Sequence, residues 1–172
     1  HLDGARLFNV LVETGDTPMQ YGKLFNTISI CLSKGLGAPV GSVLISDADT
    51  IARARKIRKV MGGGMRQSGY LAAAGIYALD HHIHRLRDDH GRARRSAAKL
   101  QLMPWVGEVF PVPTNIVIFR VADHLTADQV VMALARHGIT CSAITPRLVR
   151  WVFHLEITDD MVATIENLPE QL

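Results

Sequence analysis

The feature that most constrains this chain is a lysine at the junction between a strand and a glycine-rich turn. Residues 27–32 read as a buried strand, and the segment 33–41 that follows contains Gly35, Gly37 and Gly41. Lys34 therefore stands at a rigid strand end, where few Cβ atoms obstruct the approach of a ligand to the backbone. Such a placement suits a lysine with a chemical role, such as the formation of a Schiff base with an aldehyde.

Two other interpretations of Lys34 are a surface lysine and part of a phosphate-binding loop. The loop pattern G-x-x-x-x-G-K-S/T is absent, because the glycines follow Lys34 instead of preceding it. A Ser-x-x-Lys nucleophile is also absent, because Cys31 stands three residues before the lysine. The choice is therefore between a lysine with a chemical role and an ordinary surface lysine.

A second strand end, at residues 1–6, carries an acid and a guanidinium. Asp3 facing a pyridine nitrogen would keep that nitrogen protonated and make the ring an electron sink; alternatively, Asp3 caps the helix expected at 7–12. Arg6 offers a fork of donors to a phenolic oxygen or a substrate carboxylate, or it lies on the surface of that helix. Together with Lys34, these residues are the parts of a pyridoxal 5'-phosphate (PLP) site.

A glycine triplet at 62–64 indicates an anion site. Three consecutive glycines expose their N–H groups, and Arg66 follows almost directly, which suits a phosphate or a carboxylate. The alternative is a flexible hinge that carries an exposed arginine.

A second candidate for anion binding is Arg150, in the strand expected at 148–157. The period of two places Arg150 on one face of this strand and Trp151 and Phe153 on the other. We expect Arg150 to be buried, and a buried arginine needs an anion. A substrate carboxylate would serve, and an internal glutamate is the alternative.

Charge and composition exclude several classes. Nineteen basic and sixteen acidic residues give a net charge of +3, which is too mild for a nucleic-acid-binding protein. No apolar run approaches the ~20 residues of a membrane span. Cys31 and Cys141 lie far apart, which predicts free thiols in a reducing cytoplasm. His81 and His84 have helical i, i+3 spacing but no third ligand, so a solvated face is expected rather than a metal site.

The pattern of elements predicts an α/β protein with two regions. In the first, strands are expected at 27–32 and 40–45, and helices at 7–12, at 50–57 behind an Asp47 or Asp49 cap, and at 68–100. The long last helix is expected to bury its first half and expose its second, including Arg92, Arg94 and Arg95. In the second region, strands at 114–121, 139–144 and 148–157 and two helices predict an antiparallel sheet covered on one face.

The start of the chain resembles the end of a strand whose beginning is absent, since His1, Leu2 and Asp3 precede the first turn. We therefore expect this chain to be the C-terminal part of a longer polypeptide.

Three segments carry a family resemblance: HLDGAR at 1–6, SICLSKGLGAPVGS at 29–42, and GGGMRQSG at 62–69 followed by LAAAG at 71–75. In this order, and with Arg150 in its strand, they resemble the low-specificity L-threonine aldolases. These are PLP enzymes of the aspartate-aminotransferase fold (fold type I). The resemblance implies that residues 1–103 are the C-terminal part of the PLP-binding large domain and that residues 104–172 are a small α/β domain.

The resemblance also implies a role for each candidate residue. Lys34 would bind PLP covalently, Asp3 would pair with the pyridinium nitrogen, and Arg6 would lie beside cofactor and substrate. Arg66 would reach a phosphate from a neighbouring subunit, with Lys59 near the same site. Arg150 would hold the substrate carboxylate.

The activity implied is an aldehyde-lyase reaction, the retro-aldol cleavage of L-threonine or L-allo-threonine to glycine and acetaldehyde. The implied assembly is a cytoplasmic homo-oligomer, a dimer or a tetramer, without a metal. The alternatives are a beta-eliminating lyase of the same fold and a non-catalytic fragment that only associates with partners. In the family, the first half of the protein supplies the histidine that stacks on the ring, so this chain alone is expected to bind PLP poorly.

Overall fold

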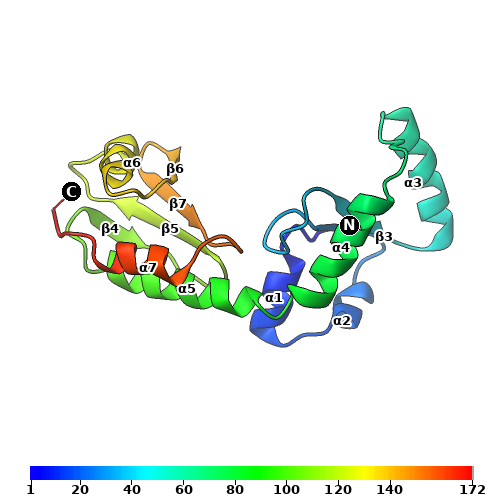
Figure 1. Cartoon of the computed structure of the whole chain (residues 1–172), viewed down its shortest axis with the longest axis horizontal. Coiled ribbons are helices and arrows are strands. Elements are labelled where there is room, and N and C mark those ends of the chain that lie inside the picture. Colours follow the sequence, from blue (N-terminus) through cyan, green and yellow to red (C-terminus); the bar gives the residue numbers. More distant parts are fainter. Residues whose placement is uncertain (172) are drawn as a thin grey trace. The chain divides into compact units, whose positions relative to one another are not determined.

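The computed structural model describes residues 1–171, which divide into unit 1 (His1–Leu86) and unit 2, which starts at Arg87 (Figure 1). Unit 1 contains a three-stranded sheet of order β1-β2-β3. The short strand β1 (Leu2–Asp3) runs parallel to β2 (Ile28–Cys31), and β3 (Ser42–Ile45) runs antiparallel to β2. Four helices accompany the sheet: α1 (Leu7–Thr14), α2 (Pro18–Gly22), α3 (Ala48–Val60) and α4 (Gly69–His81).

Helix α1 packs on β2, and the residues in contact follow the helical spacing in α1 and the period of two in β2. Leu7 and Leu11 are one helical turn apart, Ile28 and Ile30 share one face of the strand, and all four are buried in one cluster. A second cluster joins the turn after β2 to α4 and to Leu86, and its members are Leu32, Leu36, Ala38, Ala78 and Leu86. These two clusters fix the position of β2 and of the turn that follows it.

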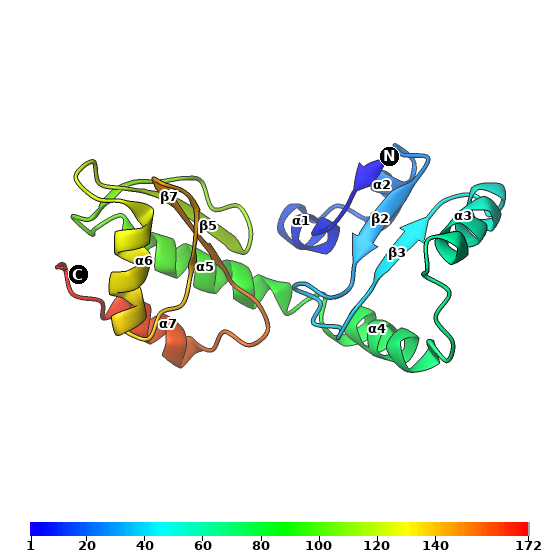
Figure 2. The ribbon, with the colours of Figure 1, turned by 90° about the horizontal axis from the view of Figure 1, so that it is seen from above.

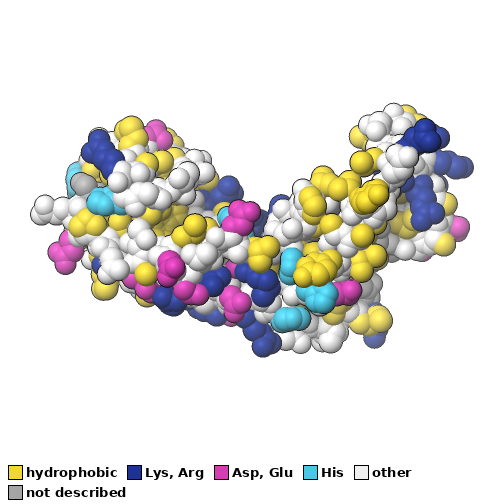
Figure 3. Space-filling model, in the orientation of Figure 1, with side chains coloured by type: hydrophobic (Ala, Val, Ile, Leu, Met, Phe, Trp, Pro, Cys, Tyr) yellow, Lys and Arg dark blue, Asp and Glu magenta, His cyan; other side chains and the backbone are white. Residues whose placement is uncertain are grey.

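The outer elements of unit 1 bury little. All four residues of β3 are exposed, and α3 has no buried residue. Large apolar side chains are exposed on α3 and α4, including Val60 at 87% and Ile76 at 60%. Figure 3 shows hydrophobic side chains gathered over α4 on this face of unit 1. An apolar surface of this kind is typical of a contact with other polypeptide.

Most of the expected elements of unit 1 are confirmed. Of the two caps considered for α3, Asp47 is the one used, because its Oδ1 accepts a hydrogen bond from the Thr50 N–H at 2.8 Å. The glycine triplet ends this helix as predicted, and Gly62 has the left-handed φ of 84° that favours glycine.

The single long helix expected over 68–100 is wrong. The structure has two helices, α4 and α5 (Leu86–Leu100), and the N–H of His82 ends α4 by binding the Ala78 carbonyl. The expected burial is also reversed, because α4 buries only Gly75 and Ala78. Within its charged sequence, α5 instead buries a stripe of small and apolar residues: Leu86, Ala93, Ala97 and Leu100. Spacing of three and four residues, rather than charge content, decides which face is buried.

Unit 2 is an antiparallel sheet with helices on one face, as predicted (Figure 2). Its strand order is β4-β5-β7-β6, and its elements are β4 (Val106–Val109), β5 (Ile116–Val121), α6 (Ala127–Arg136), β6 (Ser142–Thr145), β7 (Leu148–Val152) and α7 (Asp159–Glu166). Val117 pairs with Trp151 and Phe119 with Val149, and all four lie in one core with α5, α6 and α7. The sequence did not indicate β4, which is four residues long and contains a glycine.

Of the α5 arginines expected on a solvated face, Arg94 and Arg95 are exposed, and Arg92 and Arg95 also form ion pairs. Arg92 Nη2 lies 2.7 Å from Asp159 Oδ2, and Arg95 contacts both Asp159 and Glu166 at 2.9 Å. Hydrogen bonds from Arg92, and then from Arg95, hold the pKa of Asp159 below its ordinary value of 3.8. These ion pairs therefore join α5 to α7.

We expect Asp159→Asn to destabilise the protein at pH 7 more than Asp160→Asn, which removes a neighbouring charge from the same helix turn. Because folding lowers the pKa of Asp159, its contribution is complete above pH 3.8 and is lost as the pH falls through the depressed pKa. Urea unfolding at pH 7 and pH 3 measures this difference. Equal midpoints for the two variants at pH 7 would contradict the assignment.

Candidate active site

The parallel pairing of β1 with β2 brings two of the candidate residues to the same sheet edge. Asp3 is the last residue of β1 and pairs with Ser29, and Lys34 follows the last residue of β2 by three positions. Both side chains are exposed. The carboxyl ends of parallel strands are where open α/β sheets bind ligands. An acid and an amine therefore share an edge that suits a small, polar ligand.

The turn that carries Lys34 is held by its backbone. The Gly37 N–H donates to the Lys34 carbonyl at 2.9 Å, and the Ala38 N–H donates to the Leu32 carbonyl at 3.0 Å. Gly37 has a φ of 72°, so a residue with a Cβ would be strained there. Leu32 and Leu36 are buried on either side of Lys34. The backbone is thus anchored while the amine stays in the open.

Asp3 is oriented by its own turn. Its Oδ1 accepts a hydrogen bond from the Ala5 N–H at 3.2 Å, which is the local contact expected of an acid ahead of a helix. This contact uses only Oδ1 of the Asp3 carboxylate, so Asp3 can make it and still bind a ligand. Arg6 follows as the N-cap residue of α1 and is half-buried.

Gly4 lets the two strand ends meet closely. Its N–H donates to the Ser29 carbonyl at 2.8 Å, and a Cβ at this position would lie 2.7 Å from the same oxygen. Any larger residue would push Asp3 away from β2. The glycine after the acid is therefore required by the packing of the strands.

Two residues near this sheet edge, Asn9 and His82, were not predicted from the sequence. Asn9 is 3% exposed and its Oδ1 would lie 3.5 Å from a Cβ added at Gly35, so it packs beside the lysine turn. His82 places Nδ1 2.6 Å from the Leu36 carbonyl oxygen. A polar residue within the apolar run 7–12 was a signal for Asn9. His82 lies between His81 and His84, for which the sequence predicted a solvated face.

The segment after α3 forms a separate group. Lys59 packs beside the glycine triplet, since its Cγ would lie 3.4 Å from a Cβ at Gly64, and Arg66 is exposed two residues later. Gln67 has a φ of 52°, a left-handed conformation that is uncommon for a residue with a side chain. Within residues 1–171, no described hydrogen bond or ion pair links this group to Asp3 or Lys34.

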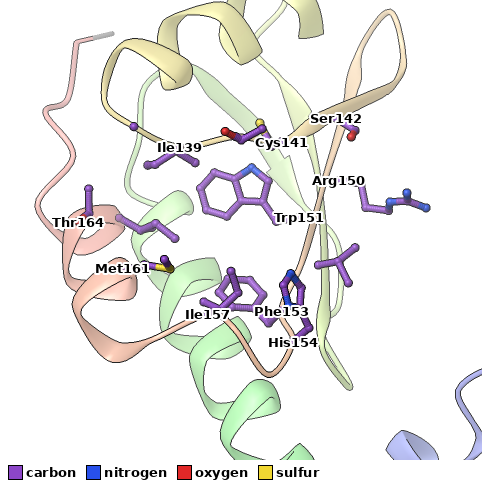
Figure 4. A pocket seen from close by; sticks show the side chains of 14 residues that line it. Ile139, Cys141, Ser142, Arg150, Trp151, Phe153, His154, Ile157, Met161 and Thr164 are labelled. Atoms are coloured by element: carbon purple, nitrogen blue, oxygen red, sulfur yellow. The ribbon is translucent and has the colours of Figure 1, made fainter. Parts of the chain in front are cut away.

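Arg150 is exposed, which corrects the expectation that it is buried. It lies on β7 opposite Ile118, on the sheet face that the helices leave uncovered, and in Figure 4 its side chain points away from Trp151. The same face carries Arg120, which pairs with Glu108 at 3.4 Å. No comparable acidic partner contacts Arg150 among the described residues. The internal glutamate that was the alternative is therefore not observed within residues 1–171.

The helix-covered face of β7 opens into a pocket of about 320 Å³ (Figure 4). Its wall includes Trp151, Phe153, Ile157 and Cys141. Burial raises the pKa of the Cys141 thiol, so the thiolate is disfavoured there. Arg150 also lines this pocket, and in Figure 4 its side chain points away from Trp151.

Neither a metal cluster nor a membrane helix is found in the described part of the chain. No group of three or more His, Cys, Asp or Glu residues within 1–171 could hold a metal ion. No helix in the same range has the length and apolarity needed to cross a bilayer.

A family model described as beta-eliminating lyase matches residues 1–124. The chain belongs to the beta-eliminating lyase family. Low specificity L-threonine aldolase of Escherichia coli is 41% identical over 165 residues, which is 96% of this chain and 48% of that protein. Low-specificity L-threonine aldolase 1 of Arabidopsis thaliana is 38% identical, over 92% of this chain and 45% of its own length. The chain spans about half the length of these curated relatives.

Solved structures confirm the predicted fold class of this beta-eliminating lyase family member. Threonine aldolase of Leishmania major superposes with a TM-score of 0.75 at 18% identity, covering 96% of this chain and 49% of that structure. Histidinol-phosphate aminotransferase of Clostridium acetobutylicum gives 0.61 at 14% identity, covering 91% and 51%. The chain therefore has the aspartate-aminotransferase-like α/β fold of these enzymes.

We expect Gly4→Ala to destabilise the protein by about 1–3 kcal/mol, the usual cost of overpacking, because its Cβ meets the Ser29 carbonyl. Gly22→Ala is the matched control, since a Cβ there meets nothing within 4 Å in α2. Urea unfolding of the two variants measures the difference. If Gly4→Ala were as stable as Gly22→Ala, the close approach of β1 to β2 would be contradicted.

Proposed function

We propose that the protein containing this chain is a PLP-dependent aldehyde-lyase that cleaves L-threonine or L-allo-threonine to glycine and acetaldehyde. The observation that carries the proposal is the placement of Asp3 and Lys34 at the carboxyl ends of neighbouring parallel strands. The family supports a PLP-dependent enzyme, and the names of the relatives support threonine cleavage over other PLP reactions. The alternative, beta-elimination on the same fold, would release pyruvate and ammonia instead, and the names of the relatives do not favour it.

The residues at the sheet edge fit PLP by their chemistry. Lys34 supplies an exposed primary amine that can condense with an aldehyde, and Asp3 supplies a carboxylate for a pyridinium nitrogen. Arg6 supplies donors for the phenolic oxygen or for the substrate. When bound, PLP supplies an electron sink for the carbon that loses its bond to the substrate side chain. The protein's part is to hold the ring, keep its nitrogen protonated and orient the substrate.

Arg150 is proposed to bind the α-carboxylate of the substrate. Its exposure and its lack of an acidic partner among the described residues leave its five N–H donors available to an anion. Arg66 is proposed to bind a phosphate across a subunit boundary, with Lys59 and the glycine triplet beside it. The exposed apolar side chains of α3 and α4 support a homo-oligomer, a dimer or a tetramer, and a cytoplasmic location is proposed with it.

The domain division at 103/104 remains part of the proposal. Residues 1–103 would belong to the PLP-binding large domain and residues 104–172 would form the small domain. A chain that spans about half of its relatives is also proposed to leave other PLP contacts to polypeptide outside it.

We expect Lys34→Ala in the intact protein to remove both the visible absorbance of covalently bound PLP and the cleavage of threonine. Turnover should fall by roughly a thousandfold or more, as when a covalent nucleophile is lost. Lys23→Ala, another exposed lysine of unit 1, is the control and should behave like the wild type. Acetaldehyde release and mass mapping after borohydride reduction provide the measurements. A PLP label on any other lysine would contradict the proposal.

We expect Arg150→Ala to raise the KM for threonine by about 10- to 100-fold, the effect of losing charge-assisted hydrogen bonds, with a smaller change in kcat. Arg120→Ala is the control, because Arg120 lies on the same sheet face but is already paired with Glu108. Steady-state kinetics distinguish the two. An unchanged KM in Arg150→Ala would exclude Arg150 from carboxylate binding.

A further inference from the structure

We infer that His82 is a positioning residue for Lys34, acting through the backbone of the lysine turn. This inference rests on the proposed function, since it assigns a role around the amine that binds PLP. His82 lies between His81 and His84, which are exposed, but is itself half-buried. Its imidazole contacts the turn that carries Lys34.

The contact is specific in its chemistry. Nδ1 of His82 lies 2.6 Å from the carbonyl oxygen of Leu36, two residues after Lys34. A carbonyl oxygen can only accept, so Nδ1 must carry the hydrogen. No backbone N–H among the described hydrogen bonds donates to the Leu36 carbonyl. The imidazole therefore supplies a hydrogen-bond donor to this carbonyl, in a residue that is only 4% exposed.

The surroundings of His82 hold its ring in place. His82 ends α4, and the ring of Tyr77 lies edge-on to it at 5.5 Å between centroids. The imidazole is therefore attached to a helix end and contacts an aromatic ring on one side. Both contacts restrict the direction of its N–H. A donor with a defined direction fixes the peptide plane that it binds.

Two further close contacts join the segment from Gly75 to Leu86 to the turn that carries Lys34. A Cβ added at Gly75 would lie 2.9 Å from Leu32 Cδ1, and a Cβ at Gly35 would lie 2.9 Å from Leu86 Cδ2. The segment from Gly75 to Leu86 thus touches the lysine turn before, after and beside Lys34. His82 supplies a polar contact to the same turn through its side-chain hydrogen bond to the Leu36 carbonyl.

The position of the contact explains why it would affect Lys34. The Leu36 carbonyl and the Gly37 N–H belong to one peptide group, and that N–H closes the turn on the Lys34 carbonyl at 2.9 Å. The hydrogen bond from His82 to the Leu36 carbonyl oxygen therefore also orients the Gly37 N–H toward the Lys34 carbonyl. Loss of the imidazole donor would free this peptide plane to rotate and would broaden the positions that the amine samples.

The test compares four variants of the intact protein loaded with PLP. His82→Leu removes the donor. His82→Asn keeps an N–H donor two bonds from Cβ, where Nδ1 stands, and His82→Gln moves it one bond further out. His84→Leu is the matched control, since His84 is exposed two residues away. The readouts are hydrogen exchange at Gly37 and Ala38, the pH at which the absorbance of bound PLP changes, and kcat and KM for threonine.

In His82→Leu and His82→Gln we expect exchange at Gly37 and Ala38 to accelerate about tenfold, as for one lost hydrogen bond, and the pH of the absorbance change to shift. His82→Asn should restore both, and His84→Leu should match the wild type. Normal exchange and an unshifted absorbance in His82→Leu, or no recovery in His82→Asn, would overturn the inference. If His82→Leu does not fold, the comparison of His82→Asn with His82→Gln decides it. Wild type that binds no PLP at Lys34 would instead refute the proposed function.

Discussion

The parallel pairing of β1 with β2 is the constraint on which the rest of the site depends. Only two residue pairs form it, Leu2 with Ile28 and Asp3 with Ser29. It persists because Gly4 allows the backbones to meet and because Leu7 and Leu11 pack α1 against the neighbouring strand. An antiparallel pairing would place the acid and the lysine at opposite ends of the sheet. The strand direction is thus what makes a shared site possible.

The lysine turn combines a fixed backbone with an exposed side chain. Its backbone is held by hydrogen bonds at Leu32 and Gly37 and by the imidazole of His82, while the side chain of Lys34 is exposed. A catalytic amine needs both properties, since its Cα must stay in place while its nitrogen meets a ligand. In unit 2 the sheet likewise has one face that is fixed by packing and one face that carries an exposed side chain. One face is buried under helices, and the other presents Arg150 to solvent.

Much of the fold could be predicted from local patterns. Strands β2, β3 and β5 and helices α1, α3 and α6 lie where periodicity, caps and turn residues in their own segments place them. The break between α4 and α5 could not be predicted, since no glycine or proline marks it and His82 there binds a turn 46 residues away in the sequence. The burial of Arg150 was also misjudged. Periodicity identifies the two faces of a strand, but only the packing of the helices shows which face is covered.

The site followed the same division. Lys34 and Asp3 could be found because each stands at the end of a strand, a position that sequence reveals. His82 and Asn9 could not be placed near Lys34 from the sequence, because each contacts residues that become neighbours only after folding. We predict that PLP with a 15N-labelled ring nitrogen, bound to the intact protein at pH 8, shows a protonated nitrogen by NMR in the wild type and a deprotonated one in Asp3→Ala. A deprotonated nitrogen in the wild type, or an unchanged signal in the variant, would contradict it.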